Sequence, residues 1–365
     1  MRGRLSIALT LLASTLAWLL AFPATPAPAK VSAQLFKGGL AFPTSFDFVP
    51  DDGSVFYGEL KTGEIHVLSP NGAVDSLFFT VPELETTRDM GLLGLALHPD
   101  YPATPHVFVY ATRTVAGTTE NQILRITDDA GTGEDMTKIF GNPLLPGEDH
   151  NGGPIEFGPD GKLYAWIGDE HDEAAAQDTS SVLGKILRME PDGSAPPDNP
   201  FPSSLVWSYG HRNGFGLAFD PETDRAWETE NGVTCNDELN KLVPGRNFGW
   251  GPRARCKSRL DPPRNTNRDG PNPVLPKAFY KRAIAPTGIT FCEGCHLGAK
   301  SNGRIFFGAW NTHAIRRVSL RPSRNRVESQ EVVYVHSAGI LTMRSAPDGT
   351  IYFSDPTGIW KLVAS

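Results

Sequence analysis

Beyond its N-terminal segment, the sequence has no apolar run long enough to cross a lipid bilayer, which takes about 20 residues. It has no excess of basic residues: the formal net charge is -7, which disfavours nucleic acid as a partner, because binding phosphates needs a basic face. No long stretch has the helical period of 3.6 residues. With 39% hydrophobic and 21% charged residues, the chain is also not a disordered one.

The one long apolar run lies at residues 5–22. Two arginines precede it, and small residues follow, with Ala27 and Ala29 at the -3 and -1 positions of a cleavage site before Lys30. This pattern predicts a signal peptide over residues 1–29 and export to the periplasm or the cell exterior. A retained membrane anchor is the alternative, because the run is nearly long enough to span a bilayer.

A turn followed by two alternating strands recurs six times along the chain. The units begin near Phe48, Leu97, Phe157, Phe219, Thr290 and Ser345. Such units of about 50 to 60 residues predict small sheets repeated around an axis. We therefore expect an all-β fold, a six-bladed β-propeller of four-stranded antiparallel sheets over residues 30–365. A pair of β-sandwiches is the alternative, but it does not predict such a repeat.

Two details of this fold can be predicted as well. The last strand, "GIWKLV" at residues 358–363, is expected to share a blade with the first strand after Lys30 and so to close the ring. Short helical turns are expected at residues 89–97 and 180–189. Residues 253–276 have no periodicity and many turn formers, which indicates a long loop near one face.

Cysteine is scarce, with four residues in the whole chain. In an exported protein the simplest pairing is Cys235 with Cys256 and Cys292 with Cys295, although three pairings are possible. Cys292 to His296 also matches CxxCH, the attachment motif of c-type haem. The motif lies in a short polar loop between predicted strands, too small to enclose a porphyrin, which favours the disulfide.

His150 and Asp169 stand at the two ends of a predicted hairpin, "HNGGPIEFGPDGKLYAWIGD". The strand directions would bring both residues to the same rim. A carboxylate that fixes the tautomer of a histidine makes that histidine a good general base. The alternative is a surface histidine and a turn aspartate with no relation to each other.

Two further segments carry polar residues next to predicted strands. Arg212 offers a rigid fork of donors for carboxylate or quinone oxygens, or else forms a structural salt bridge. Between Glu230 and Glu238, oxygen-bearing residues are dense in a loop that contains glycine. Such a loop suits Ca²⁺, which takes carboxylates and backbone carbonyls together, or it is a solvated acidic turn.

Between about Phe42 and Leu362, six phrases in the same order resemble the glucose/sorbosone dehydrogenase family, which comprises soluble PQQ-dependent aldose sugar dehydrogenases with six-bladed propellers. The phrases are "GLLGLALHPDY", "HNGGPIEFGPDGKLYAWIGD", "GKILRMEPDG", "YGHRNGFGLAFDP", "ENGVTCNDELNKLVPGRNFGW" and "APTGITF". The resemblance implies an exported quinoprotein that oxidises the C1 hydroxyl of an aldose to the lactone. Hydride would pass to PQQ, and the electrons would pass to an external acceptor.

The resemblance also implies roles for individual residues. His150 would be the general base and Asp169 its support. Arg212 and Asn213 would hold PQQ, with Asp89 near the place of a family glutamine. Backbone carbonyls at Gly232 and Val233 would bind the catalytic Ca²⁺, while Glu238 would bind a second, structural Ca²⁺ found in some members.

The chain departs from the family pattern at several places, among them Asp89 near the place of a glutamine and Gly232-Val233 in place of the Gly-Pro of the calcium turn. Phe248 replaces a tyrosine, no lysine stands in "GAWNTH", and Arg344 is displaced from the expected place of a cofactor-binding arginine. The missing bases clamp the acidic cofactor in sugar-oxidising members, so the alternative is a cofactor-less propeller that binds a carbohydrate or a protein. A calcium-dependent hydrolase is a third possibility, although the loops offer few side-chain metal ligands.

Overall fold

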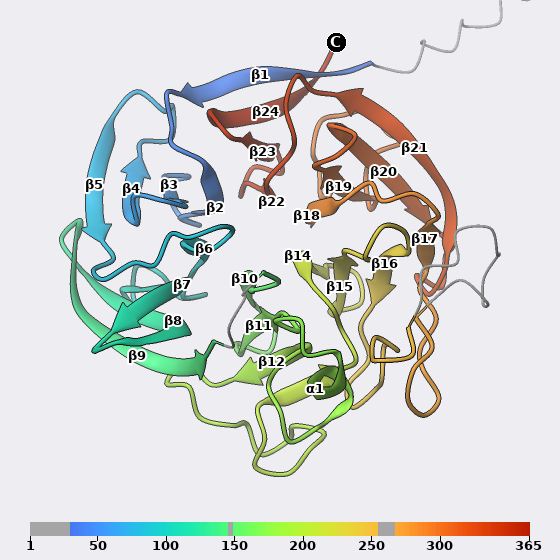
Figure 1. Cartoon of the computed structure of the whole chain (residues 1–365). Coiled ribbons are helices and arrows are strands. Elements are labelled where there is room, and N and C mark those ends of the chain that lie inside the picture. The colour runs from blue at the N-terminus through green and yellow to red at the C-terminus, as the bar shows by residue number, and fades with distance from the viewer. Residues whose placement is uncertain (1–29, 145–148, 255–266) are drawn as a thin grey trace, which may run out of the picture.

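The structure is a computed structural model that describes residues 30–144, 149–254 and 267–365. These residues form six four-stranded antiparallel sheets around a central axis (Figure 1). This confirms the predicted all-β, six-bladed β-propeller. The predicted signal peptide, residues 1–29, lies outside the described residues. Among the residues described, no helix is long and apolar enough to cross a membrane.

We number the blades 1 to 6 along the chain, and each predicted repeat unit spans the turn between the first two strands of one blade. The first strand of each blade lies nearest the axis (Figure 1). Blades 1 to 3 comprise β2 (Pro43–Phe48), β3 (Val55–Glu59), β4 (Glu64–Leu68) and β5 (Asp75–Thr80); β6 (Leu92–Leu97), β7 (His106–Val115), β8 (Thr118–Asp129) and β9 (Thr132–Pro143); β10 (Gly152–Phe157), β11 (Leu163–Ile167), β12 (Lys185–Met189) and β13 (Val206–Tyr209).

The other half of the ring follows the same plan. Blades 4 to 6 comprise β14 (Gly214–Asp220), β15 (Arg225–Glu230), β16 (Asp237–Lys241) and β17 (Ala278–Tyr280); β18 (Pro286–Phe291), β19 (Ile305–Ala309), β20 (Ala314–Leu320) and β21 (Val327–Val335); β22 (Met343–Ser345), β23 (Ile351–Asp355), β24 (Gly358–Ala364) and β1 (Val31–Gly38).

The ring is closed as predicted, because β1 pairs antiparallel with β24 in blade 6. Figure 1 shows the N-terminal strand in blue beside the C-terminal strand in red. Pairing the first strand with the last holds the two ends of the chain together, and it covers an edge of β24 that would otherwise be open.

The two predicted helical turns are wrong. Residues 89–97 contain β6, and residues 180–189 contain β12. Nearly every residue of both strands is buried. Their apolar runs therefore lack the alternation of apolar and polar residues that marks a half-exposed strand. In the described part of the chain, the one α-helix is α1 (Glu173–Gln177), which Asp172 caps by accepting a hydrogen bond from the backbone N–H of Ala175 at 2.9 Å.

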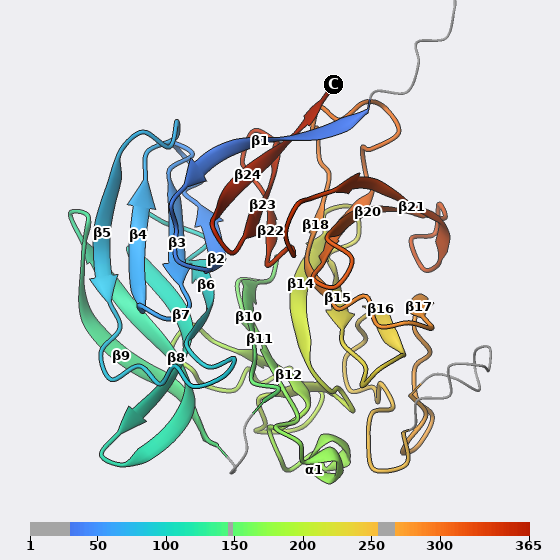
Figure 2. The ribbon, with the colours of Figure 1, turned by 45° about the horizontal axis from the view of Figure 1, so that its top comes forward.

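The blade architecture sorts the loops between the two ends of the channel. Turns between the first and second strands line a cavity of about 440 Å³ at one end, with Pro50, Pro99, Pro159 and Pro221 in its wall. Residues that precede a first strand or follow a second strand therefore lie at the opposite end. Side chains from neighbouring blades fill the space between the sheets, which Figure 2 shows standing side by side. The fold thus gathers the candidate site residues at one mouth of the channel.

Candidate functional site

The predicted His150–Asp169 pair forms at this mouth. His150 precedes β10, Asp169 follows β11, and these strands are antiparallel neighbours. Nδ1 of His150 lies 2.6 Å from Oδ1 of Asp169. The approach depends on Gly168, because a Cβ there would lie 1.5 Å from the carbonyl oxygen of His150. The hairpin therefore brings together the two residues that the sequence placed at its ends.

The Asp169 carboxylate is fixed by further donors and is almost fully buried. Nε1 of Trp250 donates to its Oδ2 at 2.6 Å, and the backbone N–H of His171 donates to Oδ1 at 3.3 Å. A carboxylate held in this way accepts the Nδ1–H of His150. The neutral imidazole then carries its lone pair on Nε2, the form that can accept a proton.

Arg212 faces that lone pair. Nη2 of its guanidinium lies 2.8 Å from Nε2 of His150. Nη1 donates to the carbonyl oxygens of Asn231 at 3.0 Å and Gly232 at 2.8 Å. The guanidinium carbon also lies 5.4 Å from the centre of the Trp250 ring. One cation therefore connects the histidine with the loop in which we predicted calcium-binding carbonyls.

The loop in which we predicted calcium binding is shaped by Asp237. Its Oδ1 accepts the backbone N–H of Gly232 at 2.8 Å, and its Oδ2 accepts those of Ile284 at 2.6 Å and Ala285 at 2.8 Å. Val233 has an exposed side chain. Glu238 lies on β16, buried, where Oε2 accepts a 3.2 Å hydrogen bond from Nδ2 of Asn240. Gly232 is thus brought to the Arg212 cation, whereas Glu238 belongs to the interior of blade 4.

Asn213 and Asp89 both support the "HNGG" segment. Oδ1 of Asn213 accepts the backbone N–H of Gly152 at 3.1 Å, and Oδ1 of Asp89 accepts Nδ2 of Asn151 at 3.0 Å. Burial, with help from the nearby Asp149, raises the pKa of Asp89. Two of the three residues predicted to bind the cofactor therefore flank His150, Asn213 from the turn before blade 4 and Asp89 from the loop before blade 2.

A mostly apolar cavity of about 320 Å³ lies at the same mouth. Asp89 and Asn231 line it, so it adjoins both supports of the histidine site. The rest of its wall is formed by Phe42, Thr44, Leu60, Leu93, Pro154, Phe215, Ala285, Thr287, Trp310 and Leu341. Its lining, as far as the structure describes it, holds no lysine or arginine. Arg344 instead pairs with Glu156 farther along the channel.

These residues fit calcium better than they fit an acidic quinone. The carbonyl oxygens of Asn231 and Gly232 already converge on a cationic group, and carbonyl oxygens are ligands that Ca²⁺ accepts. The apolar cavity fits the flat ring system of PQQ, with Trp310 and Phe42 among its walls. The carboxylates of PQQ, however, would need a basic partner. Beside the cavity this partner is Arg212, whose guanidinium donates to the carbonyl of Asn231 in the cavity wall.

Two residues at the site were missed in the sequence. Trp250 lies in the quoted "NFGW" phrase, but nothing in that phrase signals a bond to Asp169 from 81 residues away. The ring of His171 lies against that of His150, with centres 4.0 Å apart and planes tilted by 35°, and its position two residues after Asp169 was the available signal. Both enclose the His150–Asp169 pair.

The cysteine predictions are confirmed where the structure describes them. Cys292 and Cys295 form a disulfide in the loop after β18. Both sulfurs are therefore already bonded, whereas thioether attachment of haem would need them. Cys235 is buried, while Cys256 lies outside the described residues, so the Cys235–Cys256 pairing stays a prediction.

Fold and site together define a β-propeller with a histidine–carboxylate pair at one mouth of its channel. The chain belongs to the Glucose / Sorbosone dehydrogenase family, whose model matches residues 40–359. It is 26% identical to aldose sugar dehydrogenase YliI of Escherichia coli over 89% of this chain and 90% of that protein. It is 31% identical to quinoprotein glucose dehydrogenase B of Acinetobacter calcoaceticus, over 54% of this chain and 48% of that protein.

A solved structure agrees with this assignment. The PQQ-bound aldose sugar dehydrogenase of Streptomyces coelicolor superposes with a TM-score of 0.75 at 28% identity, covering 93% of this chain and 99% of that one. The likeness extends over the whole propeller, including blades 3 and 4, which carry the histidine site.

Proposed function

We propose that this chain is an exported quinoprotein oxidoreductase that oxidises the C1 hydroxyl of aldose sugars to the lactone, with PQQ and Ca²⁺ as cofactors. The observation that carries the proposal is the His150–Asp169 pair, held in the tautomer of a general base at one mouth of the channel. Membership of the glucose/sorbosone dehydrogenase family supports it. An external acceptor would take the electrons, and a membrane would be a partner only if the N-terminal segment is retained.

His150 would accept the proton of the sugar hydroxyl at Nε2. Asp169 would stabilise the resulting imidazolium through Nδ1, and Trp250 would hold the carboxylate in place. The half-exposed His171, which lies against one side of the ring, would limit the water that reaches that side. When bound, PQQ supplies a quinone that accepts hydride, and Ca²⁺ polarises it as a Lewis acid.

Arg212 must move before His150 can act. Its guanidinium donates one hydrogen bond to the lone pair on Nε2 of His150 and another to the carbonyl oxygen of Gly232. A calcium ion at the carbonyls of Gly232 and Val233 would displace the guanidinium from that loop, since two cations cannot share one carbonyl at short range. Released from His150, Arg212 would turn toward the acidic groups of the cofactor, with Asn213 and Asp89 keeping the histidine segment in register.

A second function is favoured by one observation, the absence of lysine and arginine from the described lining of the apolar cavity. An acidic cofactor gains most of its affinity from such bases. A propeller of this family without these basic residues would act as a carbohydrate- or protein-binding module. The His150–Asp169 pair would then stabilise the loops at the channel mouth.

Reconstitution separates the two functions. Purified protein is mixed with PQQ and Ca²⁺, and the reduction of the quinone and of an added dye is followed with a panel of aldoses. The proposal expects sugar-dependent reduction that needs all three components. Sugar binding by calorimetry without any reduction, and without PQQ binding, would instead establish the binding module.

A further inference from the structure

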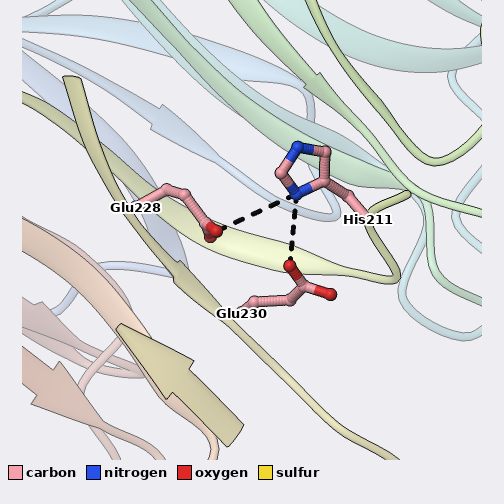
Figure 3. A group of neighbouring side chains, drawn as sticks. All are labelled: His211, Glu228 and Glu230. Carbon is pink, nitrogen blue, oxygen red and sulfur yellow. Dashed lines mark hydrogen bonds and ion pairs between the residues drawn. The ribbon is translucent and has the colours of Figure 1, made fainter. Parts of the chain in front are cut away.

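A second cluster of ionisable side chains lies inside the wall between blades 3 and 4. His211 comes from the turn between β13 and β14, and Glu228 and Glu230 come from β15. The two glutamates alternate with Thr229 along the strand, so both point to one face. Figure 3 shows them directed at the same nitrogen of His211. Nδ1 of His211 lies 3.2 Å from Oε2 of Glu230 and 3.9 Å from Oε1 of Glu228.

All three side chains are shut off from solvent, with exposures of 0%, 0% and 1%. Neither carboxylate oxygen of Glu228 has a partner in full hydrogen-bond geometry in the described part of the chain, although the nearby side chains of Asn240 and Trp166 favour its charged form. Burial, and after it the charge of Glu230, raises the pKa of Glu228. A buried carboxylate without partners costs several kcal/mol of folding free energy, so it must be protonated or bound to a cation.

The neighbouring cations are engaged elsewhere. The ammonium of Lys185 donates to the carbonyls of Ala175, Ala176 and Leu183. The guanidinium of Arg212 donates to backbone carbonyls and faces His150. No lysine or arginine within the described ranges forms an ion pair with Glu228 or Glu230. The cluster therefore has no lysine or arginine in direct contact with its carboxylates, although the nearby charge of Arg212 partly offsets the effect of burial on the pKa of Glu230.

The surroundings of His211 prepare it as a ligand. Without a metal, the Nδ1–H of His211 donates to Oε2 of Glu230 at 3.2 Å. When a metal ion replaces that proton, the hydroxyl of Ser208, 2.9 Å from Nε2, accepts the Nε2–H and leaves the lone pair on Nδ1. This lone pair then faces the two carboxylates. The ring is held by stacking on Phe248 at 4.6 Å and by the edge of Trp166 at 5.2 Å. Second partners of this kind fix the tautomer and direction of metal-bound histidines.

The spacing of the ligand atoms matches a small metal ion. One ligand atom from each of the three residues lies within 4.8 Å of the others. Ligands at about 2.1 Å from a tetrahedral Zn²⁺ lie about 3.4 Å apart. The distances of 3.2 and 3.9 Å bracket this value, so small side-chain movements would complete the site. An imidazole among the ligands selects first-row transition metals over Ca²⁺.

We propose that His211, Glu228 and Glu230 bind one divalent first-row transition metal ion, of the Zn²⁺ or Mn²⁺ class, between blades 3 and 4. The ion is separate from the calcium expected at Gly232. It connects two blades, and it fixes Oε1 of Glu230, which accepts the backbone N–H of Arg212 at 2.9 Å. Its role is therefore structural, and it also positions the residue that faces His150.

Metal analysis of the full chain tests this site. Protein purified without chelator is expected to hold about one Zn²⁺ or Mn²⁺ per chain by plasma mass spectrometry. Glu228→Gln and His211→Gln should lower the affinity for added Zn²⁺ or Mn²⁺ by about tenfold or more, because each removes a ligand. His336→Gln is the matched control, since His336 is also a buried histidine paired with a carboxylate, and it should leave the metal content unchanged.

Two outcomes would overturn the site. One is wild-type protein that neither contains stoichiometric Zn²⁺ or Mn²⁺ nor gains thermal stability when these ions are added. The other is a folded Glu228→Gln variant with unchanged metal affinity. If the variants do not fold, X-ray absorption of the wild-type protein loaded with Zn²⁺ decides. A nitrogen and oxygen shell with imidazole scattering is expected, and a shell without imidazole contradicts the proposal. None of these readouts depends on sugar oxidation.

Discussion

Blades 3 and 6, which face each other across the channel (Figure 1), each hold a histidine–aspartate pair. The partners in both pairs are 19 residues apart, His150 with Asp169 at 2.6 Å and His336 with Asp355 at 2.8 Å. A tryptophan donates to the aspartate in each, at 2.6 Å in blade 3 and 3.0 Å in blade 6. The two tryptophans differ in origin, because Trp360 lies on β24 of the same blade, whereas Trp250 reaches blade 3 from the loop after β16 of blade 4.

The pairs differ in what surrounds the second ring nitrogen. Nε2 of His150 faces Arg212 at the channel mouth. Nδ1 of His336 lies 3.1 Å from the hydroxyl of Tyr334, and Phe353 and Trp360 pack against its ring. The His150 side chain is 12% exposed and that of His336 is 3% exposed. A histidine–carboxylate pair is therefore a recurrent part of this fold, and chemistry is possible only where its free nitrogen can meet a substrate.

The largest expected difference is in activity. His150→Ala should leave the protein folded and lower sugar oxidation by a factor of roughly 100 or more, the usual scale for a lost general base. His336→Ala should leave turnover per folded protein within about twofold of wild type, because its ring is only 3% exposed and packs against Phe353 and Trp360. Reconstituted aldose oxidation is the measurement. Near-normal turnover in His150→Ala would remove this residue from the mechanism.

Replacing Asp169 and Asp355 in turn should distinguish an aspartate that supports the catalytic histidine from one that only stabilises the fold. Asp169→Asn should lower turnover by about tenfold or more, because an amide no longer stabilises the imidazolium. Asp355→Asn should instead cost about 1–3 kcal/mol of unfolding free energy, since it weakens a buried charged hydrogen bond, with turnover unchanged. Chemical denaturation and steady-state kinetics on both variants make the comparison. Equal kinetic losses would mean that the two pairs are not functionally distinct.

Calcium should act on blade 3 and not on blade 6. At roughly ten times its Kd, Ca²⁺ should stabilise the protein by about 1.4 kcal/mol and should be required for activity. Trp250 lies under Arg212, so displacement of the guanidinium should also change tryptophan fluorescence. The change should vanish in Trp250→Phe and persist in Trp360→Phe. If extensive treatment with EGTA alters neither activity nor stability, the predicted calcium site is absent.

The smallest expected effect is on the pH at which the protein unfolds in acid. The pKa of Asp355 is lowered, since hydrogen bonds from His336 and Thr357 outweigh the opposing effect of burial. A lowered carboxyl pKa contributes stability above the unfolded value near 3.9, and this contribution is lost as pH falls through the folded value. Asp355→Asn should therefore flatten the loss of stability below about pH 4, moving acid unfolding by a few tenths of a pH unit. An unchanged acid transition would show that this pair is not linked to folding.

Much of the fold could be predicted from the sequence, because each repeat unit carries its own turn and strand pattern over a short distance. The same local logic placed His150 and Asp169 at one rim, since a hairpin fixes where its ends lie. It failed at 89–97 and 180–189, where strands buried on both faces carry unbroken apolar runs.

Only the tertiary structure decided which residues complete the two clusters in blades 3 and 4. Trp250 reaches Asp169 from 81 residues away, and Glu228 meets His211 because one blade packs on the next. His336 and His150 have the same spacing to their aspartates, and this spacing alone cannot tell the two pairs apart. Sequence determined the repeat and the pairs because these are set by hydrogen bonds within one blade. Solvent access, charge balance and the free nitrogen depend on contacts between blades, which no local pattern encodes.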